Sequence, residues 1–266
     1  MRAAEASSRN PARTEDTDRA RLVKSGRALG WRANPAGMAS ERRLQILCLH
    51  GYRQNDVFFR EKTGSLRKMI KKYADLHYAC APHRPNVESS EERGDVRGWW
   101  FTKADSQFSS RDVTDLATGF DDSVEYLVKY IKEKGPFDGL LGFSQGACML
   151  HLLLAKMELG EVEISKPQFV MFASGFLSLS SQHAQYTSLR LLTTPSLHIF
   201  GTGDEVVLYP VSERLRDQFR PEGDSTTGVD CSSEIRHDGG HFIPPMSRYK
   251  EPLIAFLEQQ LAQKGE

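Results

Sequence analysis

From residue 44 onward, short apolar runs alternate with longer segments of helical periodicity, and this alternation is what most constrains the fold. A continuous apolar run is typical of a strand buried on both faces, whereas apolar residues every three or four positions indicate an amphipathic helix. The expected strands span residues 44–49, 76–81, 137–143, 169–173, 196–200 and 233–236, and the expected helices span residues 58–73, 112–134, 147–159, 211–219 and 247–263. Such alternation requires right-handed crossovers and predicts one α/β domain, with a mostly parallel sheet flanked by helices on both faces.

Residues 1–37 differ in composition from the rest of the chain. They carry eight basic and four acidic residues, almost no large apolar side chains, and no apolar stretch typical of a secretory signal. Such a segment cannot bury enough apolar surface to offset the entropy lost on ordering. We therefore expect a disordered extension over residues 1–40 and a folded domain over residues 41–266, with Met38 as an alternative start. A mitochondrial transit peptide is the other interpretation, although the four acidic residues weaken it.

The overall charge and the cysteines limit the classes of function. Lys+Arg and Asp+Glu both number 35, so bulk charge does not favour a nucleic-acid or membrane-surface binder, and no apolar run reaches the roughly 18 to 20 residues that span a bilayer. The four cysteines, Cys48, Cys80, Cys148 and Cys231, are scattered and form no CxxC pair. This pattern is typical of reduced thiols inside the cell. We expect a cytoplasmic protein, with a nuclear location open and a mitochondrial one less favoured.

Residues 142–146, Gly-Phe-Ser-Gln-Gly, match the pattern G-x-S-x-G where an expected strand meets an expected helix. This is the context of a nucleophile elbow, a turn too tight for side chains at the flanking glycines. The serine of such a turn is held in a strained conformation, with its hydroxyl beyond the carboxyl end of the sheet. Ser144 is therefore the candidate nucleophile.

A nucleophilic serine needs a base, and in proteins with this motif the base follows the serine along the chain. His198, His237 and His241 follow Ser144 near the late strands, but His198 lies inside an expected strand, where packing is the simpler role. The other two share the loop before the last helix, and its glycine pair lets His241 reach back to the serine. We predict His241 as the base and His237 as a surface or loop-packing residue. A metal site at this pair would need a helix, which the glycines break, so no metal is expected.

The acid of a triad is expected after a strand that lies between the serine and the histidine in the sequence. The strand at 196–200 is followed by Gly-Thr-Gly and then by Asp204. Glycine turns place a carboxylate just past the strand end. We predict that Asp204 orients His241 and stabilises its protonated form, and that Glu205, one position further, is solvated.

The negative charge that develops on a substrate oxygen needs backbone donors. The N–H of Gln145 lies at a helix N-terminus, which favours negative charge. The second donor is expected in the loop after the first strand, where we select the N–H of Tyr52, with Arg53 as the alternative. His50, which precedes this loop, is interpreted as structural.

Five motifs occur in one order along the chain. They are Leu49-His50-Gly51-Tyr52, Gly98-Trp99-Trp100-Phe101, Gly142-Phe143-Ser144-Gln145-Gly146, Gly203-Asp204 and His237-x-Gly-Gly-His241. With them the chain resembles the FSH family of serine hydrolases over roughly residues 44–260. The resemblance implies an α/β-hydrolase fold, a triad of Ser144, Asp204 and His241, no cofactor, and carboxylesterase activity on longer esters. The second and fifth motifs are much narrower than G-x-S-x-G.

Trp99, Trp100 and Phe101 have two interpretations. They anchor a loop to the core, or they form an aromatic substrate-binding wall for an alkyl or acyl chain. We see no insertion long enough for a large lid.

The leading hypothesis is a serine carboxylesterase that acts through an acyl-enzyme on a small-molecule ester. A thioesterase or an acyl-protein deacylase uses the same constellation and is the alternative within the hydrolases. A non-catalytic binding protein on a hydrolase scaffold is the alternative from another class. We expect no nucleic-acid partner and no membrane span, and the sequence does not predict the oligomeric state.

Overall fold

The computed structural model describes residues 43–86, 94–191, 193–220 and 232–264. These residues belong to one compact unit with the bounds Ser40–Glu266. The expected extension over residues 1–40 and the residue Cys231 lie outside the described residues. The thiols of Cys48, Cys80 and Cys148 are free.

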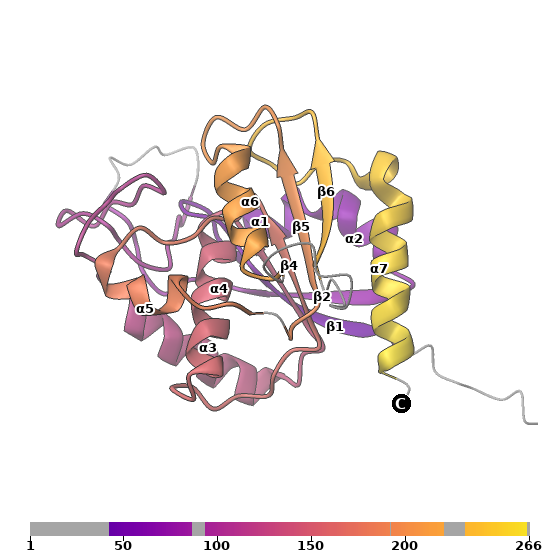
Figure 1. Ribbon diagram of the computed structural model, residues 1–266, viewed down its shortest axis with the longest axis horizontal. Helices are drawn as coiled ribbons and strands as arrows, with labels where there is room; N and C mark the ends of the chain where they lie inside the picture. Colours follow the sequence, from indigo (N-terminus) through magenta and orange to yellow (C-terminus); the bar gives the residue numbers. More distant parts are fainter. Residues whose placement is uncertain (1–42, 87–93, 192, 221–231, 265–266) are drawn as a thin grey trace, which may run out of the picture. The chain divides into compact units, whose positions relative to one another are not determined.

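The centre of the domain is a six-stranded sheet of order β2-β1-β3-β4-β5-β6, in which every neighbouring pair is parallel (Figure 1). Its strands are β1 (Leu44–Leu49), β2 (Ala74–Ala79), β3 (Gly139–Phe143), β4 (Phe169–Ala173), β5 (Ser196–Gly201) and β6 (Ser232–His237). Every residue of β3, β4 and β5 is buried, which explains why β3 and β4 contain no polar side chain and β5 contains only Ser196 and His198. The predicted α/β class and parallel sheet are confirmed.

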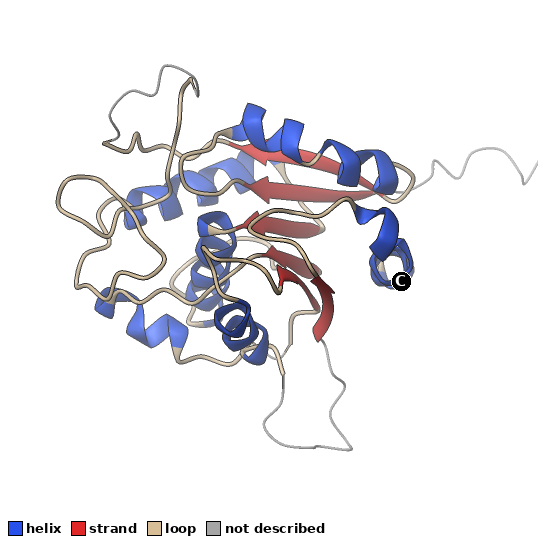
Figure 2. Ribbon diagram, turned by 90° about the horizontal axis from the view of Figure 1, so that it is seen from above, coloured by secondary structure: helices blue, strands red, loops and turns tan. Residues whose placement is uncertain are grey.

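Helices cover both faces of the sheet (Figure 2). They are α1 (Asp56–Lys62), α2 (Gly64–Ile70), α3 (Phe120–Lys134), α4 (Gln145–Glu158), α5 (Ala184–Thr187), α6 (Tyr209–Asp217) and α7 (Lys250–Gln263), with 3₁₀ turns at Ser181–His183 and Met246–Tyr249. Within the described ranges, no helix is both long and apolar enough to cross a bilayer.

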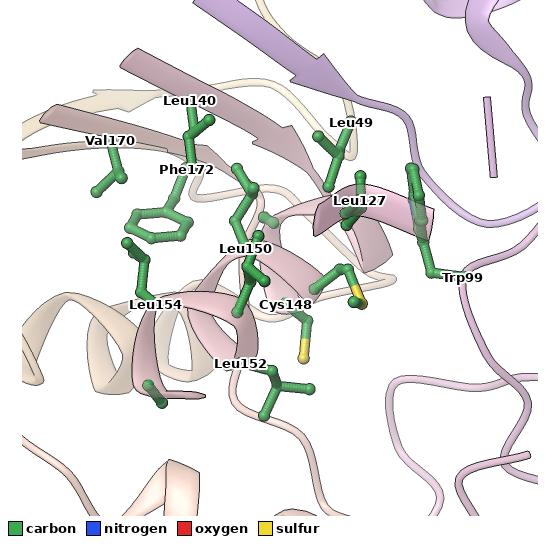
Figure 3. Close-up of a cluster of buried hydrophobic side chains, with 14 of the residues drawn as sticks. Leu49, Trp99, Leu127, Leu140, Cys148, Leu150, Leu152, Leu154, Val170 and Phe172 are labelled. Carbon is green, nitrogen blue, oxygen red and sulfur yellow. The ribbon is translucent and has the colours of Figure 1, made fainter. Parts of the chain in front are cut away.

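Alternate residues of a strand point to opposite faces, so the sheet separates two apolar cores. Leu47 of β1 packs with α3, α4 and α6, and this core contains the fully buried Trp99 (Figure 3). Ile46 packs with α1, α2 and α7 on the other face.

The expected helix 112–134 is wrong at its start, because α3 begins only at Phe120. Gly119 precedes it with a φ of 83°, and a Cβ there would lie 2.6 Å from the Nε2 atom of His83. That nitrogen also hydrogen-bonds Gly119 O at 2.8 Å. The helix therefore starts after a glycine with a left-handed backbone that is packed against a distant residue, and residues 112–119 form a loop instead.

Other boundaries shift for local reasons. The expected helix 58–73 is divided into α1 and α2 at Thr63, whose hydroxyl donates to Phe59 O at 2.8 Å. A side chain that bonds back to the previous turn competes with the helical ladder. The second strand ends at Ala79 instead of residue 81, and the last helix begins at Lys250 after a 3₁₀ turn.

Candidate active site

The predicted site residues come from different parts of the chain but share one edge of the sheet. Tyr52 follows β1, Ser144 follows β3, Asp204 follows β5 and His241 follows β6. Because all these strands are parallel, their carboxyl ends lie at the same edge. The topology thus brings loops that are up to 189 positions apart to a single place.

Ser144 occupies a strained turn between β3 and α4. Its backbone angles, a φ of 53° and a ψ of −118°, lie outside the regions that residues other than glycine usually adopt. A Cβ on Gly142 would lie 2.5 Å from the Cα of Ala147, and one on Gly146 would lie 2.3 Å from Leu49 O. Both flanking positions therefore require glycine. Backbone strain of this kind costs on the order of 1–3 kcal/mol and is concentrated at functional sites.

Ser144, His241 and Asp204 form a continuous chain of hydrogen bonds. The Oγ atom of Ser144 lies 2.9 Å from Nε2 of His241, and Nδ1 of His241 lies 2.7 Å from Oδ2 of Asp204. The carboxylate can only accept, so Nδ1 of the neutral imidazole carries the proton and Nε2 has its lone pair free for the serine hydroxyl. This arrangement can take a proton from Ser144 as its oxygen attacks a carbonyl carbon.

The second oxygen of Asp204 is held by the backbone of its own loop. Oδ1 accepts from the N–H of Val206 at 2.9 Å and from the N–H of Val207 at 2.8 Å. Burial by itself would raise the pKa of Asp204, but the hydrogen bonds from His241 and from these amides outweigh burial and hold the pKa below its usual value. Asp204 is therefore an anion in a fixed orientation at neutral pH. Glu205 is exposed beside the cleft, as expected.

The hydrogen bonds of the loop after β1 distinguish between Tyr52 and Arg53, the two candidates for the second oxyanion donor. The N–H of Arg53 donates to Arg97 O at 2.9 Å and is therefore occupied. Among the described residues, no group accepts from the N–H of Tyr52. Gln54 closes the loop, because its Oε1 atom accepts from the N–H of Gly51 at 3.2 Å. Of the two, only the amide of Tyr52 is available to a ligand.

His50 ties this loop to the core. Its Nδ1 atom lies 2.8 Å from Gly51 O, and its Nε2 atom accepts from the N–H of Ala81 at 2.9 Å. Burial lowers the pKa of His50 to about 4, so it stays neutral in this bonding pattern. These contacts agree with a structural role.

The side chain of Gln145 has a role that the sequence analysis missed. It is fully buried, with Oε1 accepting from the N–H of Trp99 at 2.9 Å and Nε2 donating to Trp100 O at 2.7 Å. The indole N–H of Trp99 in turn donates to His50 O at 2.8 Å. The segment that contains Trp99 and Trp100 therefore links Gln145, the first residue of α4, to His50, which directly follows β1. No local pattern in the sequence indicates this contact, because its partners are about 45 positions apart.

The geometry does not support the predicted aromatic wall. Trp99 and Trp100 are completely buried, Phe101 is 4% exposed, and none of the three lines the cleft at Ser144. They correspond to the other interpretation, an anchor in the core. The aromatic surface of the cleft is instead supplied by Tyr52 and Phe108, and Trp100 packs behind Phe108 with ring centroids 5.2 Å apart.

The cleft at Ser144 has a volume of about 430 Å³. Its walls are lined by Tyr52, Phe108, Ser109, Ser110, Arg111, Ser144, Glu205, Val206 and His241. The Nη2 atom of Arg111 donates to Glu205 O, so the loop around Phe108 is joined to the loop that contains Asp204. Phe108 was not identified from the sequence because it lies in an irregular loop with no periodic pattern.

The other two late histidines pack inside the protein. His198 is buried within β5, with its Nε2 atom 3.0 Å from Ser196 Oγ. His237 is only 3% exposed and its Nδ1 atom accepts from the N–H of Gly239 at 3.2 Å, so it packs within the loop and not at the surface. Desolvation lowers the pKa of both. His241 alone of the three reaches Ser144.

Comparisons with known proteins agree with this geometry. A family model described as "Serine hydrolase (FSH1)" matches residues 38–253. The chain is 48% identical over 230 residues to esterase C25G4.2 of Caenorhabditis elegans, covering 86% of this chain and 99% of that protein. It is 35% identical over 234 residues to esterase OVCA2 of Homo sapiens, covering 84% and 99%.

Solved structures with low sequence identity show the fold. Acyl-protein thioesterase 2 of Zea mays superimposes with a TM-score of 0.53 at 22% identity, covering 81% of this chain and 94% of that chain. TT1662 of Thermus thermophilus gives 0.53 at 20% identity, covering 82% and 89%. The domain therefore has the α/β-hydrolase fold.

Proposed function

This chain belongs to the FSH1 family of serine hydrolases, and we propose that it is a carboxylesterase that works through an acyl-enzyme on Ser144. The observation that carries the proposal is the unbroken hydrogen-bond chain from Ser144 through His241 to Asp204 at a strained elbow. Strain at the serine and a buried, fixed carboxylate are both costly features. A hydrolase uses both, whereas a binding protein on the same scaffold needs neither.

In the first half of the proposed reaction, Ser144 attacks the ester carbonyl while His241 takes its proton. The carbonyl oxygen becomes negatively charged and accepts hydrogen bonds from the N–H groups of Gln145 and Tyr52. Asp204 stabilises the imidazolium without taking the proton itself. His241 then protonates the alcohol oxygen, the bond from that oxygen to the acyl carbon breaks, and the acyl group stays on Ser144.

The second half repeats these roles with water. His241 removes a proton from a water molecule as the water oxygen attacks the acyl carbon. The bond to Ser144 breaks, the proton passes to its Oγ atom, and the carboxylic acid leaves.

We infer a preference for long alkyl or acyl esters. Support for this comes from the volume of the cleft, about 430 Å³, and from the apolar surface that Tyr52, Phe108 and Val206 supply among its polar residues. A thioesterase would use the same residues. Turnover of matched oxygen and sulfur esters with one acyl group separates the two activities.

The test compares Ser144 with a serine that also lies within hydrogen-bond distance of a histidine but away from the cleft. Ser178 Oγ lies 2.8 Å from His183 Nδ1 within the core, so Ser178→Ala is a matched control for Ser144→Ala. We expect a fluorophosphonate probe to label the unaltered protein and Ser178→Ala, but not Ser144→Ala. Ester hydrolysis should follow the labelling and fall by several powers of ten in Ser144→Ala. Labelling that persists in Ser144→Ala would refute the assignment of the nucleophile.

A further inference from the structure

His241 lies between two hollows at the carboxyl edge of the sheet. The larger is the cleft of about 430 Å³ that contains Ser144 and Tyr52. The smaller has a volume of about 150 Å³ and is lined by Gln54, Phe59, Lys62, Phe143, His241, Phe242 and Ile243. The smaller hollow thus adjoins the base but neither the nucleophile nor Tyr52.

The smaller hollow is lined mostly by apolar and aromatic side chains, with Gln54 and Lys62 as its other polar residues beside His241. The rings of Phe59 and Phe143 are almost completely buried and stack with centroids 6.0 Å apart. The Phe143 ring lies 4.9 Å from the ring of His241, and Phe242 and Ile243 line the hollow from the loop that follows. An apolar cavity of about 150 Å³ accommodates a molecule the size of benzene. The volume of the hollow therefore matches a group of about six carbon atoms.

The direction in which an ester must bind distinguishes the two hollows. Its carbonyl oxygen has to face the amides of Gln145 and Tyr52, which places the acyl carbon at Ser144 and directs the acyl chain into the larger cleft. The alcohol oxygen has to lie near Nε2 of His241 to receive a proton. Whatever is attached to that oxygen then extends past the base, where the smaller hollow begins.

We propose that the smaller hollow is the leaving-group pocket of the esterase proposed above, and that it selects primary alcohols with an apolar group of about six carbon atoms. The acyl chain occupies the larger cleft. Ile243 and Phe242 limit the length of the alcohol, and Val206 and Phe108 contact the acyl chain.

A second activity follows, because the pocket becomes vacant once the first alcohol has left. An apolar alcohol can then enter and compete with water for the acyl-enzyme. Its oxygen attacks the acyl carbon while His241 takes its proton. The bond to Ser144 breaks, the proton returns to the Oγ atom of Ser144, and a new ester leaves. The enzyme would thus transfer acyl groups to apolar alcohols.

The first experiment uses two ester series with the unaltered protein. In n-alkyl esters of one acyl group, kcat/KM should rise by about fourfold per added methylene group up to about six carbons and then level off. The rate constant of deacylation should be the same throughout this series, since all its members form one acyl-enzyme. Added hexanol should divert part of the acyl group into the hexyl ester.

The second experiment uses a matched pair of variants that fill one hollow each. Ile243→Trp should lower kcat/KM for the hexyl ester at least tenfold relative to the methyl ester and reduce transfer to hexanol, while leaving acyl-length preference within about threefold. Val206→Trp, whose native side chain is 51% exposed in the larger cleft, should shorten the accepted acyl chain and leave alcohol preference within about threefold.

The outcomes separate this proposal from the function on which it rests. A flat dependence on alcohol length in the unaltered protein, or an Ile243→Trp variant that changes acyl preference instead, would overturn the pocket assignment while hydrolysis persists. The proposed function itself would be refuted if probe labelling and ester hydrolysis both survived in Ser144→Ala. Should Ile243→Trp fail to fold, the alkyl series and the hexanol experiment decide the question alone.

Discussion

Replacing Asp204 with asparagine should reverse the direction of the hydrogen bond to His241. The two backbone donors Val206 and Val207 require an oxygen at the position that Oδ1 now occupies. An asparagine satisfies them with its carbonyl oxygen, which turns its NH₂ group toward Nδ1 of His241. A donor at that place stabilises the tautomer with a proton on Nε2, and this tautomer cannot accept the proton of Ser144.

The size of the effect follows from the cost of the opposite orientation. Turning the amide would leave two backbone N–H groups facing an NH₂ group, and each unsatisfied donor costs about 1–3 kcal/mol. Restoring the reactive tautomer therefore costs about 2–6 kcal/mol. At about 1.4 kcal/mol per tenfold change in rate, kcat/KM should fall by roughly 30-fold to 2 × 10⁴-fold.

The assay measures ester hydrolysis together with the tautomer of His241 by nitrogen NMR. Glu205→Gln is the matched control. It also removes one negative charge, but from an exposed side chain at the next position in the sequence. We expect this control to retain activity within about threefold and to keep the proton of neutral His241 on Nδ1. An asparagine variant with the proton still on Nδ1, or equal losses in both variants, would refute the reasoning.

Three further outcomes are expected. His241→Ala should remove nearly all activity, whereas His237→Ala should keep most of it, and steady-state kinetics with a larger loss at His237 would overturn the choice of base. Burial lowers the pKa of His50 to about 4 and of His151 to about 3, so the unfolded chain binds more protons below about pH 6.5. Urea unfolding should therefore show stability falling by up to about 1.4 kcal/mol per pH unit for each histidine as the pH drops from 6.5 toward 4, and a flat profile would contradict this. A chain that begins at Met38 should keep its thermal midpoint and kcat/KM, and a large loss of either would show that the preceding residues contribute to the domain.

Local patterns in the sequence were enough to predict the parallel sheet and to identify the residues that meet at its edge. Buried strands are continuous apolar runs, so β1 and β4 were predicted to the residue. Ser144 was identified because the turn from strand to helix needs glycine on both sides, as the close contacts of Gly142 and Gly146 bear out. Asp204 and His241 follow strands in a parallel sheet, so their convergence depends on topology alone. These features depend on neighbours in the sequence or on the direction of strands.

Only the tertiary structure decided which side chains face the cleft and which face the core. Trp99 and Trp100 are buried in a segment that is held by distant residues: Gln145 bonds to the backbone of both, and His50 O accepts from the indole N–H of Trp99. The two hollows beside His241 are likewise lined by side chains from segments that lie far apart in the sequence. A tryptophan in a loop carries no periodic signal, and burial depends on partners brought close by the folded chain.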